Sequence, residues 1–162
     1  MSTIMEQARR GEVTDLMRAI AEKEGVSPEF VRNGIASGRI CAPHNPVHDA
    51  EPAAIGEGLS VKINVNLGTS RDIVDLDSEL EKLRVGLRYG ADAVMDLSTG
   101  GDIDAIRARL LKECPVMMGS VPIYQTGLTA ARRNAVVEMT EDDIFNGIEK
   151  HAKDGMDFMT VH

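Results

Sequence analysis

The chain has 162 residues, of which 43% are hydrophobic and 27% are charged, and this is ordinary for one globular domain with its own core. Its formal net charge of −8 argues against a nucleic-acid binder and against a protein of anionic membrane surfaces, because both partners are themselves negative. The cysteines, Cys41 and Cys114, are far apart in sequence and fit a reducing compartment, and no secretory signal or membrane-length apolar run occurs. We therefore expect a cytoplasmic protein with neither nucleic acid nor membrane as a partner.

The first forty residues predict two or three short helices. Thr14 is a good N-cap for a helix that ends at Gly25, where a left-handed glycine can close the last turn. Ser27 and Pro28 are typical of the N-cap and first position of a further helix, which ends at Gly38. This part is predicted to be a small helical subdomain, which together with the following loop takes up residues 1–60.

Residues 39–60 are predicted to be a long loop, because they hold three prolines and several small residues. His44 and His48 are its chemically most versatile side chains. They could bind a metal ion, but on a loop their spacing of four residues does not place them on one face, so a hydrogen-bonding or exposed role is favoured. We therefore assign no metal ligand to this loop.

From residue 61 the pattern changes to alternating strands and helices. Strands are predicted at 61–66, 93–96, 115–118 and 157–162. The helices between them include one with a leucine stripe, one over 103–113, and one that a capping box of Thr140 and Asp143 opens. Such an alternation predicts parallel strands joined by right-handed crossovers. Two α/β folds fit this second domain, residues 61–162: an open doubly wound sheet, or the first part of a (β/α)8 barrel.

The turn Ser98-Thr99-Gly100-Gly101 follows the second predicted strand and leads to Asp102, a good N-cap for the next helix. Backbone N–H groups at the positive end of a helix suit an anion such as a phosphate. Glycines at a strand-to-helix junction are also the ordinary signature of a tight turn. The sequence alone leaves both interpretations of this turn open.

Polar or polarizable side chains stand where the predicted strands end: Asn64, Asn66, Met95, Asp96, Tyr124 and His162. In both candidate folds, ligand chemistry collects at the carboxyl ends of the strands. Each of these residues alone also fits an ordinary structural role. Their occurrence at equivalent places on four strands predicts a shared pocket.

Several segments, in order along the chain, resemble the phosphomethylpyrimidine synthases of thiamine biosynthesis. The segments are VKINVNLGTS at 61–70, GADAVMDLSTGGD at 90–102, VPIYQ at 121–125 and DFMTVH at 157–162. A Pro-x-Asn-x-x-His element at Pro43, Asn45 and His48 also fits, and the likeness extends from about residue 4 to residue 162. This combination is far more specific than any single glycine-rich turn.

The resemblance implies an α/β fold in which a partial (β/α)8 TIM-type barrel of about four parallel strands follows the N-terminal helical subdomain. It implies a radical S-adenosylmethionine lyase that converts 5-aminoimidazole ribotide to 4-amino-5-hydroxymethyl-2-methylpyrimidine phosphate, and a homodimer for the full-length protein. The family's substrate contacts map onto Asn66, Met95, Tyr124 and His162, which are among the strand-end residues named above.

The family's cofactors are S-adenosylmethionine, a 4Fe–4S cluster held by three cysteines in a Cys-x2-Cys-x4-Cys run, and a divalent metal, zinc, held by two histidines of the later barrel. The sequence has Cys41 and Cys114 alone, and three thiolates must converge on such a cluster. The resemblance therefore assigns this chain to the N-terminal, substrate-binding part of the enzyme, which is inactive alone. It assigns no catalytic, cofactor-binding or metal-binding residue to the chain.

Two other functions stay open at the level of sequence. The 5-hydroxybenzimidazole synthases of cobamide lower-ligand biosynthesis share these motifs and use the same ribotide. A non-catalytic chain that binds a ribotide or assembles with a partner is the other alternative. A cysteine triad encoded after His162 would favour the enzymes over this last alternative.

Overall fold

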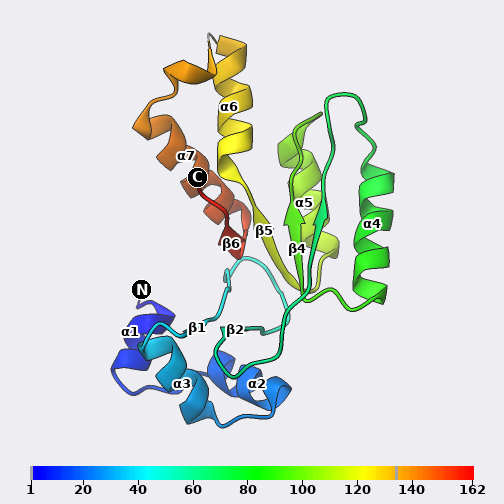
Figure 1. Ribbon diagram of the computed structural model, residues 1–162. Coiled ribbons are helices and arrows are strands. Elements are labelled where there is room, and N and C mark those ends of the chain that lie inside the picture. Colours follow the sequence, from blue (N-terminus) through cyan, green and yellow to red (C-terminus); the bar gives the residue numbers. More distant parts are fainter. Residues whose placement is uncertain (1, 134) are drawn as a thin grey trace. The chain divides into compact units, whose positions relative to one another are not determined.

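The computed structural model describes residues 2–133 and 135–162 (Figure 1). The fold is α/β, and the chain divides into two units. The first, called the helical unit, is Met1–Pro43 with Pro52–Lys62, and the second, called the sheet unit, is His44–Glu51 with Ile63–His162. The long loop is therefore shared, because its middle belongs to the sheet unit and its flanks to the helical unit. No helix in the described part of the chain is both long and apolar enough to cross a membrane.

The helical unit contains α1 (Ile4–Arg9), α2 (Asp15–Glu24) and α3 (Pro28–Ala36), followed by the antiparallel pair β1 (Ile40–Cys41) and β2 (Ile55–Gly56). The predicted caps are confirmed. The Thr14 and Ser27 side chains accept hydrogen bonds from the backbone N–H groups of the third residues of their helices, and Gly25 takes a left-handed conformation with φ of 68°. Apolar side chains from all three helices form the core of this unit.

The sheet unit is built on a four-stranded sheet of β3 (Asn64–Leu67), β4 (Ala93–Asp96), β5 (Met117–Ser120) and β6 (Phe158–Met159). The strands are parallel and lie in the order β3-β4-β5-β6, which confirms the predicted parallel arrangement. The first and last strands are shorter than predicted. Residues 61–63 precede β3, and only two of residues 157–162 are in β6. The described strands form an open sheet (Figure 1).

The helices of the sheet unit are α4 (Leu76–Arg88), α5 (Ile103–Glu113), α6 (Pro122–Arg133) and α7 (Glu141–Asp154), with a short 3-10 helix at Val136–Glu138. The predicted capping box that opens α7 is confirmed, since Thr140 and Asp143 bond to each other's backbone N–H groups. Helix α6 was not expected from the sequence. It begins immediately after β5 with Pro122, a residue well suited to the first helical turn.

The two faces of the sheet differ in what covers them. Leu67, Val94 and Met118 point toward α4 and α5 and join the main hydrophobic core with Leu83 and Leu110. Because side chains alternate along a strand, the neighbouring positions point the other way. We call that opposite side the distal face; its residues near the strand ends are Asn64, Asn66, Met95, Gly119 and Phe158.

Candidate functional site

Two of the four predicted site residues lie side by side on the distal face. Asn66 of β3 is in register with Met95 of β4, and Met95 is in register with Gly119 of β5. The Asn66 side chain is exposed, and its Oδ1 accepts a 2.8 Å hydrogen bond from the Nδ2 of Asn64. The strand ends therefore present an amide next to a half-buried thioether.

Gly119 leaves room on the distal face for the ring of Phe158. A Cβ at Gly119 would lie 2.2 Å from the Phe158 ring, so a side chain there would displace it. Beyond β6 the chain continues along β5, where the Thr160 N–H donates to the Ser120 carbonyl. The Thr160 hydroxyl then reaches the Met95 sulfur at 4.0 Å. The segment after β6 thus borders the Asn66–Met95 pair.

The other two predicted site residues form a second pair. Tyr124 lies in the first turn of α6, and its ring stacks on that of His162 with a centroid distance of 6.3 Å and an interplanar angle of 18°. Both side chains are exposed, Tyr124 by 41%. The structure therefore groups the four residues as two separate pairs, and Thr160, which contacts Met95, is two residues before His162 in the chain.

Asp96 does not belong with these residues, and the expectation that it shares their pocket is wrong. It follows Met95 in the same strand, so its side chain points toward the helices. There its Oδ1 accepts hydrogen bonds from the N–H and hydroxyl of Ser98 at 2.9 and 2.5 Å. Burial raises the pKa of Asp96 against the opposing effect of these bonds. Asp96 shapes the turn that follows β4.

The glycine-rich turn is organised by contacts with the preceding loop. The Thr99 N–H donates to the Thr69 carbonyl, and the Thr69 hydroxyl donates to the Gly100 carbonyl at 2.7 Å. A Cβ at Gly100 would lie within 2 Å of the Ser70 carbonyl oxygen, so only glycine fits between these loops. The N–H groups of Ser98 and Thr99 are occupied by Asp96 and by the preceding loop. For these residues the tight-turn interpretation is confirmed.

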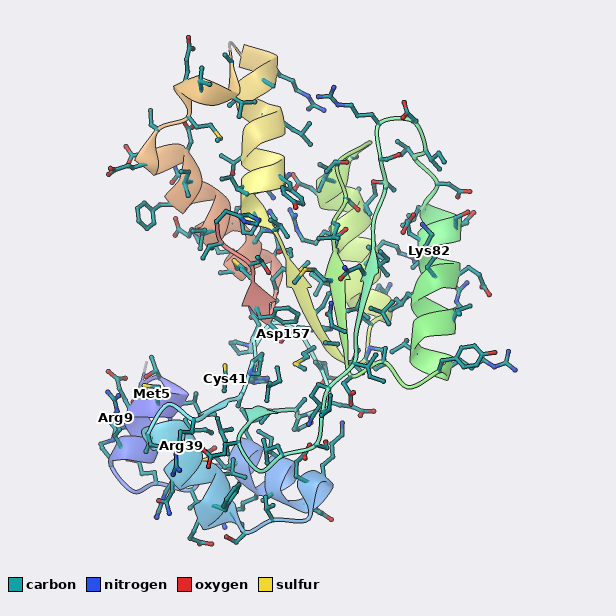
Figure 2. The ribbon with its side chains drawn as sticks, in the orientation of Figure 1. Met5, Arg9, Arg39, Cys41, Lys82 and Asp157 are labelled. Carbon is teal, nitrogen blue, oxygen red and sulfur yellow. The ribbon has the colours of Figure 1, made fainter. Side chains whose placement is uncertain are left out.

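His48 has the hydrogen-bonding role that the sequence favoured. Its Nδ1 lies 2.6 Å from Oδ2 of Asp157, the residue before β6 that Figure 2 labels, and its Nε2 lies 2.8 Å from the Cys114 carbonyl. Both partners are acceptors, so both ring nitrogens donate, and the hydrogen bond that the ring donates to Asp157 raises the pKa of His48. Asn45 of the same element donates to the carbonyls of Ala152 and Met156. The Pro-x-Asn-x-x-His element therefore attaches the loop to the sheet unit.

The raised pKa of His48 predicts a pH dependence of stability. The folded state favours the protonated ring, so its contribution is complete below the usual pKa of 6.5 and is lost as the pH rises through the higher folded-state value. We expect the free energy of unfolding to fall between pH 6 and pH 9, and His48→Gln to flatten this fall. Urea denaturation across that range measures both slopes. Identical slopes in the two proteins would contradict the assignment of a protonated His48.

His44 is exposed, and the described residues contain no group of three or more His, Cys, Asp or Glu side chains that could hold a metal ion. The cysteines do not come together either. Cys41 is exposed in the helical unit, whereas Cys114 is buried in the sheet unit. Burial raises the pKa of the Cys114 thiol to about 11, so it is a poor source of a thiolate ligand.

Sequence reasoning missed a polar network around the buried side chains of Arg107, Ser120 and His151. It consists of Asp104, Arg107, Ser120, Gln125, His151 and Asp154, and we call it the Arg107 network. These residues come from α5, the end of β5, α6 and α7. The only signal available in the sequence was an arginine on the otherwise apolar face of α5, next to Ile106 and Leu110.

The chain is similar to members of one known protein family. The model of the radical SAM ThiC family matches residues 3–162. Phosphomethylpyrimidine synthases from Thermus thermophilus, Geobacter metallireducens and Pyrococcus abyssi are 56%, 54% and 51% identical to the chain over 99% of its length. The chain spans 37–38% of the length of these relatives. The resemblance found in the sequence is thereby confirmed, and the chain belongs to the radical SAM ThiC family.

Proposed function

We propose that the chain is the ribotide-binding part of a phosphomethylpyrimidine synthase, a radical S-adenosylmethionine lyase that makes 4-amino-5-hydroxymethyl-2-methylpyrimidine phosphate from 5-aminoimidazole ribotide in thiamine biosynthesis. The observation that carries the proposal is the 48–56% identity to synthases over 99% of this chain. Because the chain spans about 37% of those relatives, the activity is that of a longer protein. We place that protein in the cytoplasm as a homodimer.

The proposal includes a (β/α)8 barrel of which β3 to β6 are the first four strands. Its support is the parallel order of the strands and an uncovered edge at β3. Next to this edge lies an open groove of about 680 Å³, lined by Ile63, Val65, Val85 and Gly86. Ile63 and Val85 are exposed, as expected where a further strand and helix would cover an apolar surface. In such a barrel the distal face is the interior.

The four site residues offer complementary contacts to a ribotide. The Asn66 amide can donate to and accept from ribose hydroxyls or imidazole nitrogens, and the Met95 thioether supplies a polarizable wall. The Tyr124 hydroxyl and the His162 ring add donors from the other pair. We propose that these groups orient the ribotide and that its phosphate is bound by residues outside this chain.

The cofactors belong to the rest of the protein. A 4Fe–4S cluster of the radical type needs three thiolates, and the two cysteines of this chain are exposed in one unit and buried in the other. The residues of this chain therefore do not fit the cluster. We place the ligands of S-adenosylmethionine, the cluster and the zinc ion in the longer protein, and we assign this chain only to binding and orienting the substrate.

Anaerobic turnover of the complete protein tests the proposed reaction. The protein with a reconstituted cluster is mixed with S-adenosylmethionine, a reductant and 5-aminoimidazole ribotide, and the product is identified by its mass. We expect the pyrimidine phosphate. A mass matching 5-hydroxybenzimidazole would overturn the proposal in favour of the cobamide pathway, and no ribotide consumption by a cluster-loaded protein would favour a non-catalytic role.

A further inference from the structure

Arg107 is the centre of the Arg107 network, which includes Gln125, the residue after Tyr124. Its side chain is 1% exposed, yet all its donor atoms have acceptors. Nε donates to Oδ2 of Asp154 at 3.0 Å and Nη2 to Oδ1 of Asp104 at 2.7 Å, and Nη2 also forms a 2.9 Å ion pair with Oδ2 of Asp154. Nη1 and Nη2 both donate to Oε1 of Gln125, at 3.0 and 2.9 Å. The guanidinium group thus joins α5 to both α6 and α7.

The Gln125 amide is bonded into this network at both its oxygen and its nitrogen. Its Oε1 accepts from Arg107, so its Nε2 is the end that donates to Oδ1 of Asp104, at 2.7 Å. The same Oε1 lies 2.9 Å from Nε2 of His151. Because the amide is bonded at both its oxygen and its nitrogen, its orientation is set, and this restrains the helical turn that carries it.

His151 extends the network to the end of β5. Its Nδ1 lies 2.8 Å from the Ser120 hydroxyl. His151 Nε2 lies 2.9 Å from Gln125 Oε1, an acceptor, and 3.0 Å from Nη1 of Arg107, a donor, so either neutral tautomer fits, and the Ser120 hydroxyl bonds to Nδ1 in both. Burial, together with the charge of Arg107, lowers the pKa of His151 to about 4, so the ring is neutral at physiological pH. The strand end and the first turn of α6 are therefore linked through α7.

Tyr124 immediately precedes Gln125 in the first turn of α6. Its exposed ring has one aromatic neighbour among the described residues, the ring of His162. We propose that Gln125 is a positioning residue of the ribotide site: by fixing the first turn of α6 to the Arg107 network, it holds the Tyr124 ring against the His162 ring. This inference rests on the proposed function, because that function makes Tyr124 and His162 contacts of the ribotide. The arrangement of the two rings can be measured without ribotide.

NMR spectroscopy of the chain with 13C-labelled histidine tests the inference. The sequence has four histidines, so the His162 ring signals are assigned by comparison with His162→Gln. Tyr124→Leu then defines the shift that the tyrosine ring imposes on the His162 protons. We expect Gln125→Met, which keeps the length of the side chain but loses its hydrogen bonds, to lose at least half of that shift with Tyr124 still present.

Thr129→Val is the matched control, because Thr129 lies one turn further along α6 and its hydroxyl bonds only to the Gln125 carbonyl. It must keep the full shift. If Gln125→Met does not fold, Ser120→Ala takes its place, because it removes the hydroxyl at the other end of the network. It must also reduce the shift that Tyr124 imposes on the His162 protons. A purely structural role would lower stability but leave the shift of the folded protein unchanged. The inference is overturned if folded Gln125→Met or Ser120→Ala keeps the full shift. It is also overturned if Tyr124→Leu leaves the His162 ring signals where they are in the unmodified chain.

Ribotide affinity of the complete enzyme separates this inference from the proposed function. We expect Tyr124→Leu to weaken binding about fivefold or more and Gln125→Met to weaken it at least about twofold, with Thr129→Val unchanged. Unchanged binding in Tyr124→Leu would refute the role of Tyr124 in the ribotide site. In that case the NMR result would still decide whether Gln125 positions the ring.

Discussion

Asp157→Ala should lower the free energy of unfolding of the sheet unit by about 3–5 kcal/mol, the typical cost of leaving a buried charge without its partner. The Asp157 side chain is fully buried and accepts hydrogen bonds from three groups, the His48 ring and the N–H groups of Asn45 and Met118. Alanine would leave a protonated histidine and two backbone donors unsatisfied. Since whole domains are stable by about 5–15 kcal/mol, urea denaturation at pH 7 should show a large loss.

Asp49→Ala is the matched control for this measurement. Asp49 is an exposed aspartate of the same loop, one residue after His48. Its replacement should change the free energy of unfolding by less than about 0.5 kcal/mol. A loss below about 1 kcal/mol in Asp157→Ala would contradict the role of Asp157 as the attachment point of residues 44–51.

Arg107→Met is the second change with a large expected effect. It keeps much of the buried aliphatic volume but removes the donors that Gln125 Oε1 and Asp154 Oδ2 receive inside the unit. We expect the free energy of unfolding to fall by about 1.5–3 kcal/mol, the typical contribution of hydrogen bonds that involve a charged group. Chemical denaturation followed by circular dichroism measures the loss.

Arg109→Met provides the same substitution on the same helix at an exposed position. Arg109 is about half exposed and pairs with Glu113, four residues later. Surface pairs of this kind contribute less than about 1 kcal/mol, so the free energy of unfolding of Arg109→Met should be close to that of the unmodified chain. Equal losses in the two variants would mean that burial of Arg107 has no special energetic consequence.

The elements that the sequence predicted best are those set by local chemistry. Thr14, Ser27 and Thr140 cap helices by bonding to N–H groups three residues away, and Gly25 and Gly155 end helices in left-handed conformations. Such motifs depend on neighbours within one turn, so they are visible in the sequence. The strand–helix alternation likewise predicted the parallel sheet.

Helix α6 and the orientation of Asp96 were harder to predict for different reasons. Gly127 and two threonines weaken the helical propensity of 122–133, and tertiary contacts through Gln125 compensate for it. Asp96 stands at a strand end like Met95, but a shift of one residue reverses the face to which a side chain points. Its place in the fold therefore depended on the exact register of β4.

The buried polar contacts could not have been predicted from sequence. His48 and Asp157 are 109 residues apart, and Arg107 and Asp154 are 47 residues apart. Neither separation corresponds to a helical or strand period, so only the folded topology brings the groups together. By contrast, Asn66 and Met95 could be paired, because parallel strands align their carboxyl ends.

Ribotide affinity of an Asn66 variant tests the central claim most directly, namely that the strand ends of this chain hold the substrate. The complete enzyme is titrated calorimetrically with 5-aminoimidazole ribotide in the absence of S-adenosylmethionine. Asn66→Leu should weaken binding by about tenfold or more, because a polar ligand loses its amide partner, while Asn33→Leu in the helical unit should bind as tightly as the unmodified enzyme. Equal affinities for all three proteins would contradict the account.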